Sequence, residues 1–348
     1  MSFAHGGDIG AYQNEILDFS ANLNPMGMPE AVKAAAMAAV AGAVHYPDPY
    51  CRKVRSALSK RDGVPENWIV CGNGAADLIF RLCMALRPQK ALLCAPSFSE
   101  YAQALELCSC AVERHPLLPE KSFELGMDYM EKLTEDTDIA FLCTPNNPTG
   151  RIIPRPVLEA AANRCRKTGT VLVIDECFLE LSDDPAGLGA MLGDNDRIVL
   201  LRAFTKSYAM PGLRFGYALS SNGELMEKLF NCGQPWSVSN VAQAAAQAAC
   251  GCPEWPEKGR ALLAQRRPEL VEALRGLGLT VWEGQANYIL FRAPGVSDLR
   301  ERTAQAGVLI RSCANYPGLG EDYYRVAVRG AEDNGRCIRA LGEVLKNG

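Results

Sequence analysis

The stretch "RIVLLRAFTKSYAMPGLRFGYALSS", residues 197–221, contains two apolar runs separated by a segment that carries a lysine and an arginine. The first run is apolar on consecutive residues, which is typical of a β-strand buried on both faces of a sheet. Lys206 follows this run, and Arg214 lies eight residues further on, close to two glycines. The stretch therefore predicts a buried strand that leads directly into a segment bearing two cationic side chains.

Similar apolar runs recur along the first 220 residues and give the fold class. They begin at residues 69, 91, 139, 171 and 215, and each is bounded by turn residues. Helical segments are expected between most of them, including residues 76–87, 154–168 and 240–250. Strands that alternate with helices indicate an α/β protein with a largely parallel sheet.

The pattern changes after about residue 250. One long charged helix is expected over residues 256–278, and strands are expected within residues 280–293, 307–313 and 323–330. This texture predicts a second, smaller α+β domain. We expect three parts: an N-terminal segment of residues 1–40 that packs with the small domain, a large cofactor-binding domain of residues 41–250, and the small domain of residues 251–348.

Composition narrows the range of partners. The 348 residues include 36 Lys plus Arg against 40 Asp plus Glu, a net charge of −4, so neither a nucleic acid nor an anionic membrane is an expected partner. The start "MSFAHGGDIG" lacks the features of a secretory signal, which predicts a cytoplasmic protein. The fourteen cysteines are scattered without metal-ligand spacing and only three histidines occur, so we expect reduced thiols and no metal site.

Polar groups collect where the predicted strands end, the edge at which open α/β sheets bind ligands. In "CGNGAADLIFRL", residues 71–82, glycines precede a helix that opens near Ala75, an arrangement suited to an anion such as phosphate. A structural turn explains the same glycines equally well. As a dinucleotide fingerprint the stretch fails, because Asp77 stands where G-x-G-x-x-G requires its third glycine.

Three further side chains point to one kind of chemistry. Asp175 ends the apolar run of "VIDECF", and a buried carboxylate there requires a cation, either an arginine or a cationic cofactor atom. A desolvated Lys206 has a lowered pKa and forms Schiff bases with aldehydes. The guanidinium of Arg214 suits a phosphate, and Thr205 adds a hydroxyl. Pyridoxal phosphate has an aldehyde, a pyridinium nitrogen and a phosphate, and so meets all three requirements.

At this point the sequence resembles the fold-type I aminotransferases over nearly its whole length. The resemblance is carried by the ordered motifs "GNGAAD" (72–77), "PNNPTG" (145–150), "DECF" (175–178), "TKSYAMPGLRFG" (205–216) and "YYRVAVR" (323–329). It implies a three-layer large domain with a mostly parallel sheet, a smaller α+β domain, pyridoxal phosphate as the cofactor, and a homodimer with a shared active site.

The resemblance also implies roles for individual residues. Lys206 binds the cofactor aldehyde, Asp175 pairs with the pyridine nitrogen, and Asn147 bonds the 3-oxygen of the ring. Arg325 binds the substrate carboxylate. The other implied cofactor contacts are Gly74, Ala75, Thr205 and Arg214 at the phosphate, Phe98 against the ring, and Tyr46 at the phosphate of the partner subunit. Phe178 departs from the pattern, because many members have a tyrosine there.

Two branches of the superfamily compete. Histidinol-phosphate aminotransferases share the core motifs, but "HGGDI" (5–9), "ILDFSANLNPMGMP" (16–29), "PWSVSNVAQ" (235–243) and "IRSCANYPGLGEDYYRVAVR" (310–329) are more similar to threonine-phosphate decarboxylases of cobalamin biosynthesis. This branch implies decarboxylation of L-threonine O-3-phosphate to (R)-1-amino-2-propanol phosphate. It implies that His5 and Arg311 bind the substrate phosphate, and that Asn22 lies near the substrate.

Other interpretations remain for single residues and for the whole chain. His5 is also consistent with an ordinary N-terminal residue, Arg311 with a surface ion pair, Phe98 with the core, and Tyr46 with a turn. A nicotinamide dehydrogenase requires the missing glycine fingerprint. A pyridoxal-phosphate-dependent transcription regulator requires an added DNA-binding module. A catalytically inactive binding protein is expected to lack Lys206.

Overall fold

The computed structural model describes residues 5–193 and 196–346, and its largest unit is a seven-stranded sheet. Six neighbouring pairs form the sheet; the four on the β4 side of β7 are parallel, and β8 runs antiparallel to both of its neighbours. The predicted α/β class with a mostly parallel sheet is confirmed. The strand order is β2 (Ile69–Gly72), β8 (Gly216–Leu219), β7 (Ile198–Ala203), β6 (Val171–Asp175), β5 (Ile139–Cys143), β3 (Lys90–Ala95) and β4 (Ala111–Pro116).

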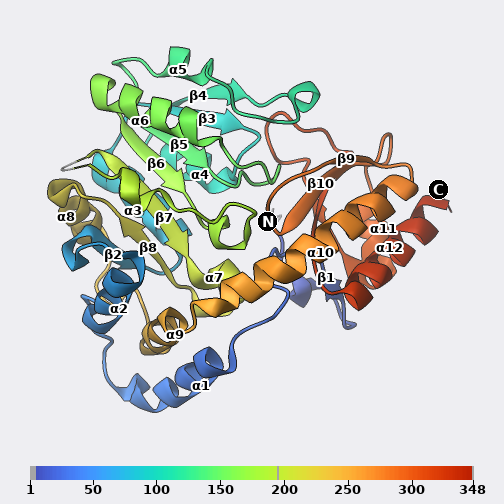
Figure 1. Ribbon diagram of the computed structural model, residues 1–348, viewed down its shortest axis with the longest axis horizontal. Coiled ribbons are helices and arrows are strands. Elements are labelled where there is room, and N and C mark those ends of the chain that lie inside the picture. The colour runs from blue at the N-terminus through green and yellow to red at the C-terminus, as the bar shows by residue number, and fades with distance from the viewer. Residues whose placement is uncertain (1–4, 194–195, 347–348) are drawn as a thin grey trace.

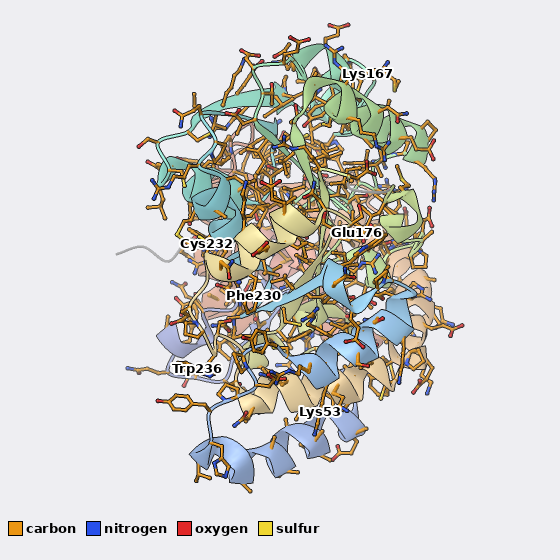
Figure 2. The ribbon with its side chains drawn as sticks, turned by 90° about the vertical axis from the view of Figure 1, so that its left-hand side faces the viewer. Lys53, Lys167, Glu176, Phe230, Cys232 and Trp236 are labelled. Atoms are coloured by element: carbon orange, nitrogen blue, oxygen red, sulfur yellow. The ribbon has the colours of Figure 1, made fainter. Side chains whose placement is uncertain are left out.

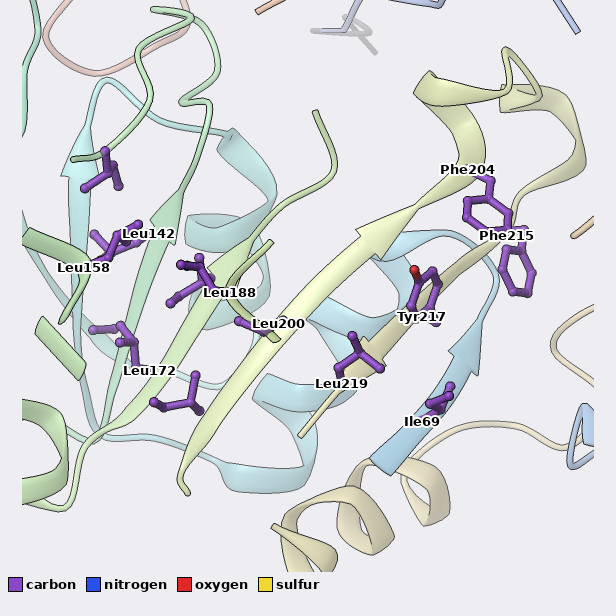
Figure 3. Close-up of a cluster of buried hydrophobic side chains, with 14 of the residues drawn as sticks. Ile69, Leu142, Leu158, Leu172, Leu188, Leu200, Phe204, Phe215, Tyr217 and Leu219 are labelled. Carbon is purple, nitrogen blue, oxygen red and sulfur yellow. The ribbon is translucent and has the colours of Figure 1, made fainter. Parts of the chain in front are cut away.

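Helices cover both faces of this sheet, which makes the large lobe a three-layer structure (Figure 1). Successive strand residues point to opposite faces, so Leu200 joins the core on one side and Leu201 the core on the other. Figure 3 shows the first of these cores, with Leu172, Leu200 and Leu219 among its members. This core contains α2 (Arg52–Asp62), α6 (Arg155–Thr168) and α9 (Asn240–Cys250); the opposite one contains α3 (Ala75–Leu86), α4 (Ser99–Glu106) and α8 (Gly223–Asn231).

Strand β4 is the one strand of the large sheet that the apolar runs miss. It lies at the sheet edge, beside β3, and reads "AVERHP". Most of its side chains are exposed or half-buried, because an edge strand has a neighbour on one side only. A search for continuous apolar runs therefore passes over it.

The small lobe has an antiparallel sheet packed against two long helices. Its order is β12 (Arg311–Ser312), β13 (Tyr323–Ala327), β10 (Tyr288–Arg292) and β9 (Thr280–Trp282). Its core includes side chains of α10 (Glu254–Gly276) and α12 (Ala331–Lys346), with α11 (Leu299–Gln305) beside them. The predicted charged helix corresponds to α10, which runs from the large lobe into the small lobe (Figure 1).

The N-terminal part contacts both lobes. Strand β1 (Leu17–Asp18) pairs in parallel with β11 (Val308–Leu309), and Phe19 belongs to the core of the small lobe. In contrast, α1 (Glu30–Ala39) packs against α9 in the large lobe. The expected boundaries between the three parts, at residues 40 and 250, stay predictions. The first residues of the N-terminal part, 1–4, and the last residues of the small domain, 347–348, lie outside the described residues. Two short helices, α5 (Tyr129–Lys132) and α7 (Phe204–Ser207), complete the structure.

Candidate active site

A cavity of about 450 Å³ opens where the strands of the large sheet end and the small lobe begins. Its walls come from loops after β2, β5, β6 and β7, from the N-terminal segment, and from the small-lobe sheet. Eleven of the residues named from the sequence line it: His5, Asn22, Ala75, Phe98, Asn147, Asp175, Thr205, Lys206, Arg214, Arg311 and Arg325. The fold therefore brings together side chains separated by up to 320 positions in the sequence.

Lys206 lies in α7, which begins directly after β7. Its Nζ is 5.5 Å from the centre of the Phe178 ring, at the floor of the cavity. Burial, together with the positive charge of Arg325, lowers the pKa of Lys206 from its ordinary 10.5 to about 8. About a tenth of this amine is therefore neutral at pH 7, and the neutral amine is the form that attacks an aldehyde.

Asp175 is the last residue of β6 and is buried. The Tyr101 hydroxyl donates to its Oδ2 at 2.6 Å, and the Cys177 backbone N–H donates to its Oδ1 at 2.9 Å. Within residues 5–193 and 196–346, no Lys, Arg or His forms an ion pair with this carboxylate. The arginine partner considered from the sequence is thus not found there, and the carboxylate suits a cationic atom of a ligand.

Gly74 and Arg214 form a cradle for an anion. Gly74 has φ +84° and precedes α3, whose first residue is Ala75. A Cβ atom at Gly74 would lie 2.6 Å from Arg214 Nη2, so the absence of a side chain lets the guanidinium approach the helix N-terminus. Thr205 is buried and lines the same cavity. Free backbone N–H groups, a hydroxyl and a guanidinium are the groups that bind phosphate.

Arg311 and Arg325 lie opposite each other on the neighbouring strands β12 and β13. Both are buried, and both line the cavity. Arg325 donates from Nη1 to the Asn147 side-chain oxygen and from Nη2 to the Ser20 backbone oxygen, the latter at 2.8 Å. With its amide oxygen turned toward Arg325, Asn22 accepts from Nη1 at 3.3 Å and from Nε at 3.2 Å.

His5 closes the side of the cavity next to Arg311. Its Nε2 is 3.3 Å from Oε1 of Glu100, in the first turn of α4. The two glycines that follow His5 have a clear packing reason, because a Cβ at Gly6 would collide with the Ser20 backbone, and Gly7 N–H donates to Ser20 Oγ at 2.7 Å. The N-terminal segment is thus held against Ser20, which also accepts from Arg325.

Two aromatic side chains complete the floor. Phe98 lines the cavity at the start of α4, edge-on to Tyr101, with ring centres 5.6 Å apart. Phe178, where a tyrosine is frequent in the resembling family, packs edge-on against Tyr288. Phe178 has no hydroxyl, but Tyr316 brings one to the same cavity. Its OH donates to Asn147 Oδ1 at 3.3 Å.

Tyr46 is the one named side chain that lies away from the cavity. It is 80% exposed and stacks on Trp236, with ring centres 4.6 Å apart. Trp236 is itself exposed, and it lies below Phe230 and Cys232 in Figure 2. Within one chain, Tyr46 therefore contributes nothing to this cavity.

Sequence reasoning missed Tyr101, Glu100 and Tyr316. A helical spacing of three links Phe98 to Tyr101 in "APSFSEY", so the signal for Tyr101 was available once Phe98 was placed. Glu100 has no such signal, because an acidic residue in the first turn of a helix is common for reasons of the helix dipole alone. Tyr316 contacts Asn147 across 169 positions, a separation that no local pattern reveals.

Within residues 5–193 and 196–346, no group of three or more His, Cys, Asp or Glu side chains is placed to hold a metal ion. No helix in these ranges is both long and apolar enough to cross a membrane. All fourteen cysteines lie in the described part of the chain, and each is a free thiol.

Residues 14–341 match the family described as aminotransferase class I and II. The chain is 40% identical to a threonine-phosphate decarboxylase of Salmonella typhimurium, over 98% of this chain and 96% of that protein. It is 33% identical to histidinol-phosphate aminotransferase 1 of Cupriavidus pinatubonensis, over 97% and 91%. The solved histidinol-phosphate aminotransferase of Clostridium acetobutylicum has a TM-score of 0.88 and 26% identity, over 96% of this chain and 100% of that chain.

Proposed function

Since this chain belongs to the aminotransferase class I and II family, we propose that it decarboxylates L-threonine O-3-phosphate with pyridoxal phosphate as its cofactor. The products are (R)-1-amino-2-propanol phosphate and carbon dioxide, a step of cobalamin biosynthesis. The higher of the two sequence identities, 40% against 33%, is to a threonine-phosphate decarboxylase. The structural similarity to a histidinol-phosphate aminotransferase supports the shared fold but does not distinguish the two substrates, so the proposed substrate rests on the residues of the cavity.

Pyridoxal phosphate is the cofactor of this chain as of its family, and the cavity fits it. Lys206 is a partly neutral amine, Asp175 is a buried carboxylate that no described cation pairs, and Gly74 leaves room for Arg214 beside a helix N-terminus. We propose that these residues meet the aldehyde, the ring nitrogen and the phosphate of the cofactor. Asn147, Phe98, Ala75 and Thr205 complete the proposed set of contacts.

The observation that carries the proposed substrate is the facing pair Arg311 and Arg325. Like charges directly opposite each other on adjacent strands destabilise a sheet, and burial adds to the cost. A ligand with two anionic groups removes both penalties at once. Threonine phosphate has a carboxylate and a phosphate, whereas histidinol phosphate has only the phosphate. We assign the carboxylate to Arg325 and Asn22, and the phosphate to Arg311 and His5.

In the proposed reaction, each of four side chains of the cavity has its own role. When bound, pyridoxal phosphate supplies an electron-withdrawing ring that stabilises negative charge at the substrate α-carbon. Asp175 would place its carboxylate beside the nitrogen of that ring. Arg311 and Arg325 grip the two ends of the substrate and so fix which bond of the α-carbon breaks. Lys206 Nζ lies at the cavity floor, where it delivers a proton to the α-carbon after carbon dioxide has left.

One incubation tests this function. The purified protein with pyridoxal phosphate is mixed with L-threonine O-3-phosphate, and carbon dioxide and aminopropanol phosphate are measured. Continuous release of both in equal amounts is the expected result. Stoichiometric keto acid without gas, or rapid turnover of histidinol phosphate with 2-oxoglutarate, would overturn the proposal in favour of a transaminase.

We also propose a homodimer whose partner subunit supplies Tyr46 to the cofactor phosphate. Exposed apolar side chains support an interface near it: Val44 is 83% exposed, Val40 is 59% exposed, and Trp236 is 45% exposed. Mixing Lys206→Ala with Tyr46→Ala protein should restore about a quarter of wild-type activity, because half of randomly formed dimers contain one intact site of two. Absence of any recovery despite demonstrated subunit exchange would contradict a shared site.

Two expectations from composition and from the sequence start remain proposals. These are a cytoplasmic location and the absence of a nucleic-acid partner. Fluorescence microscopy of the tagged protein in its host tests the first. A gel-shift titration with duplex DNA and with RNA tests the second.

A further inference from the structure

Glu100 is an acidic side chain in the wall of the cavity, beside the cationic side chains assigned to the substrate phosphate. It follows Phe98 and Ser99 at the start of α4, and its side chain is 13% exposed. Its Oε1 is 3.3 Å from His5 Nε2, and its Oε2 accepts from Ser99 Oγ at 3.0 Å. The assignment of substrate groups given above uses His5 and Arg311 and leaves Glu100 without a role.

The groups that face Glu100 come from three parts of the chain. His5 approaches from the N-terminal segment, Arg311 from β12, and Tyr316 from the loop between β12 and β13. Burial raises the pKa of Glu100 above the ordinary value of a glutamic acid, while the charges of His5 and Arg311 act in the opposite direction. A negative charge placed here is therefore close to the position that the anionic end of a substrate must occupy.

A like charge beside an anion site discriminates between anions. A second carboxylate, as in glutamate, is fully ionised near neutral pH and has no proton to share with Glu100, so the two repel. A phosphate monoester has a second pKa near 6 and three terminal oxygens. It can share one proton with Glu100 and still accept bonds from Arg311 and His5. An unfavourable contact with the wrong ligand is an established route to specificity.

We propose that Glu100 is a specificity-determining residue, which holds His5 in the cavity wall and makes the site accept a phosphate in place of a second carboxylate. The inference rests on the proposed function, because it presumes that His5 and Arg311 face the substrate phosphate. When the substrate binds, one proton is taken up from solvent. This proton forms an O–H bond on either Glu100 or the phosphate, and that O–H group donates a hydrogen bond to the other. No other bond changes.

Two unreactive ligands of equal length provide the test. 4-Phosphonobutyrate and glutarate both lack an amino group, and they differ only in the anion at one end. Isothermal titration calorimetry on the cofactor-loaded protein, in two buffers of different ionisation enthalpy, gives the affinity and the number of protons taken up. At a pH close to the second pKa of the phosphonate, we expect wild type to prefer the phosphonate and to take up protons when it binds.

Glu100→Gln should reduce the preference for the phosphonate by about tenfold, which corresponds to about 1.4 kcal/mol. It should also abolish the proton uptake. Glu106→Gln, the same change at an exposed position of the same helix, is the matched control and should alter neither quantity. Glu100→Asp keeps the charge and should retain the proton uptake.

The outcomes separate this inference from the function on which it rests. Net proton release by wild type on binding the phosphonate overturns the role of Glu100 without any variant, because a site that simply selects the dianion expels protons. An unchanged preference in Glu100→Gln overturns it too, whether or not carbon dioxide is released from threonine phosphate. Failure of the decarboxylation assay alone, with the calorimetry as expected, refutes the proposed reaction and leaves the selectivity of Glu100 standing.

Discussion

Two walls of the same cavity are built in different ways. The large-lobe wall, with Ala75, Asp175, Lys206 and Arg214, consists of residues at or near the ends of strands of a single sheet. The small-lobe wall, with His5, Asn22, Arg311 and Arg325, joins the N-terminal segment to strands near the C-terminus. One of its hydrogen bonds, from Arg325 to Ser20, spans 305 positions in the sequence.

The difference separates general chemistry from the choice of substrate. The proposed cofactor contacts lie almost entirely on the large-lobe wall, whose motifs resemble a superfamily with many reactions. The proposed substrate contacts lie on the small-lobe wall. Changes in the first wall should therefore lower kcat for every substrate, and changes in the second should alter KM and the balance between reactions.

The largest effect is expected at Lys206. Lys206→Ala removes the only amine placed in the described cavity, so covalent cofactor attachment and turnover should both fall below detection. Absorbance of the cofactor bound to the protein and release of carbon dioxide measure the two. Lys53→Ala, at an exposed position of α2 (Figure 2), is the control and should behave as wild type. Near-normal activity of Lys206→Ala would refute the assignment of this wall to the cofactor.

Asp175→Asn should give the next largest effect. Opposite charges about 4 Å apart interact by roughly 4 kcal/mol at an effective dielectric constant near 20. Loss of that interaction corresponds to a fall of about two to three decades in kcat, at 1.36 kcal/mol per tenfold. An asparagine retains one oxygen that can accept from Tyr101 or Cys177, so KM should change little. A decrease of less than threefold would mean that Asp175 acts only as the end of a strand.

Arg311→Ala tests the other wall. Loss of its charge-assisted bonds to the substrate phosphate should raise KM for threonine phosphate by roughly tenfold to a hundredfold. Unphosphorylated threonine should be an equally poor substrate for wild type and variant. Looser orientation of the carboxylate should also increase transamination, detected as the pyridoxamine form of the cofactor. A fall in kcat with unchanged KM would erase the proposed distinction between the walls.

The smallest effect concerns pH and belongs to the large-lobe wall. Because Lys206 has a pKa of about 8, cofactor attachment to the cofactor-free protein should slow by about tenfold per pH unit below that value and level off above it. Stopped-flow absorbance from pH 6 to 9 measures the rate. The unfolded chain keeps this proton up to the ordinary pKa of 10.5, so the destabilisation that comes from burying this group diminishes as pH rises from about 8 to 10.5. A rate that still rises about tenfold per pH unit up to pH 9, without levelling off, would show that the amine keeps the ordinary pKa of an exposed lysine.

The same contrast explains how far the sequence could be interpreted. Strands β2, β3, β5, β6, β7 and β8 were predictable because burial on both faces requires consecutive apolar residues. The family was predictable because residues after each strand form short motifs. The edge strand β4 was not, since exposure removes its apolar pattern. The roles of the named site residues stay predictions, and the placement of Tyr46 depends on a second subunit.

The small-lobe wall shows the limit most clearly. Sequence motifs indicated Arg311 and Arg325 separately, but their pairing across β12 and β13 depends on strand register, which no local pattern specifies. The contact between Glu100 and His5 likewise joins two segments far apart in the sequence, and no local pattern predicts that they meet. Each of these contacts is long-range, and each decides what the cavity can bind.

The facing arrangement of Arg311 and Arg325 also limits the length of substrate that the two side chains can bind at once. Directly opposed residues on antiparallel strands have Cα atoms only about 4.5 to 5.5 Å apart. The backbone spacing of a hydrogen-bonded sheet therefore fixes where the two arginine side chains begin, and so limits how far apart the two anion sites can lie. A substrate with a longer carbon chain cannot be accommodated by sliding one strand, because a shift of one residue turns the arginine to the opposite face. Variation in substrate length should consequently arise through insertions in the loop of residues 313–322, which joins the two strands, and rarely through exchange of the arginines themselves.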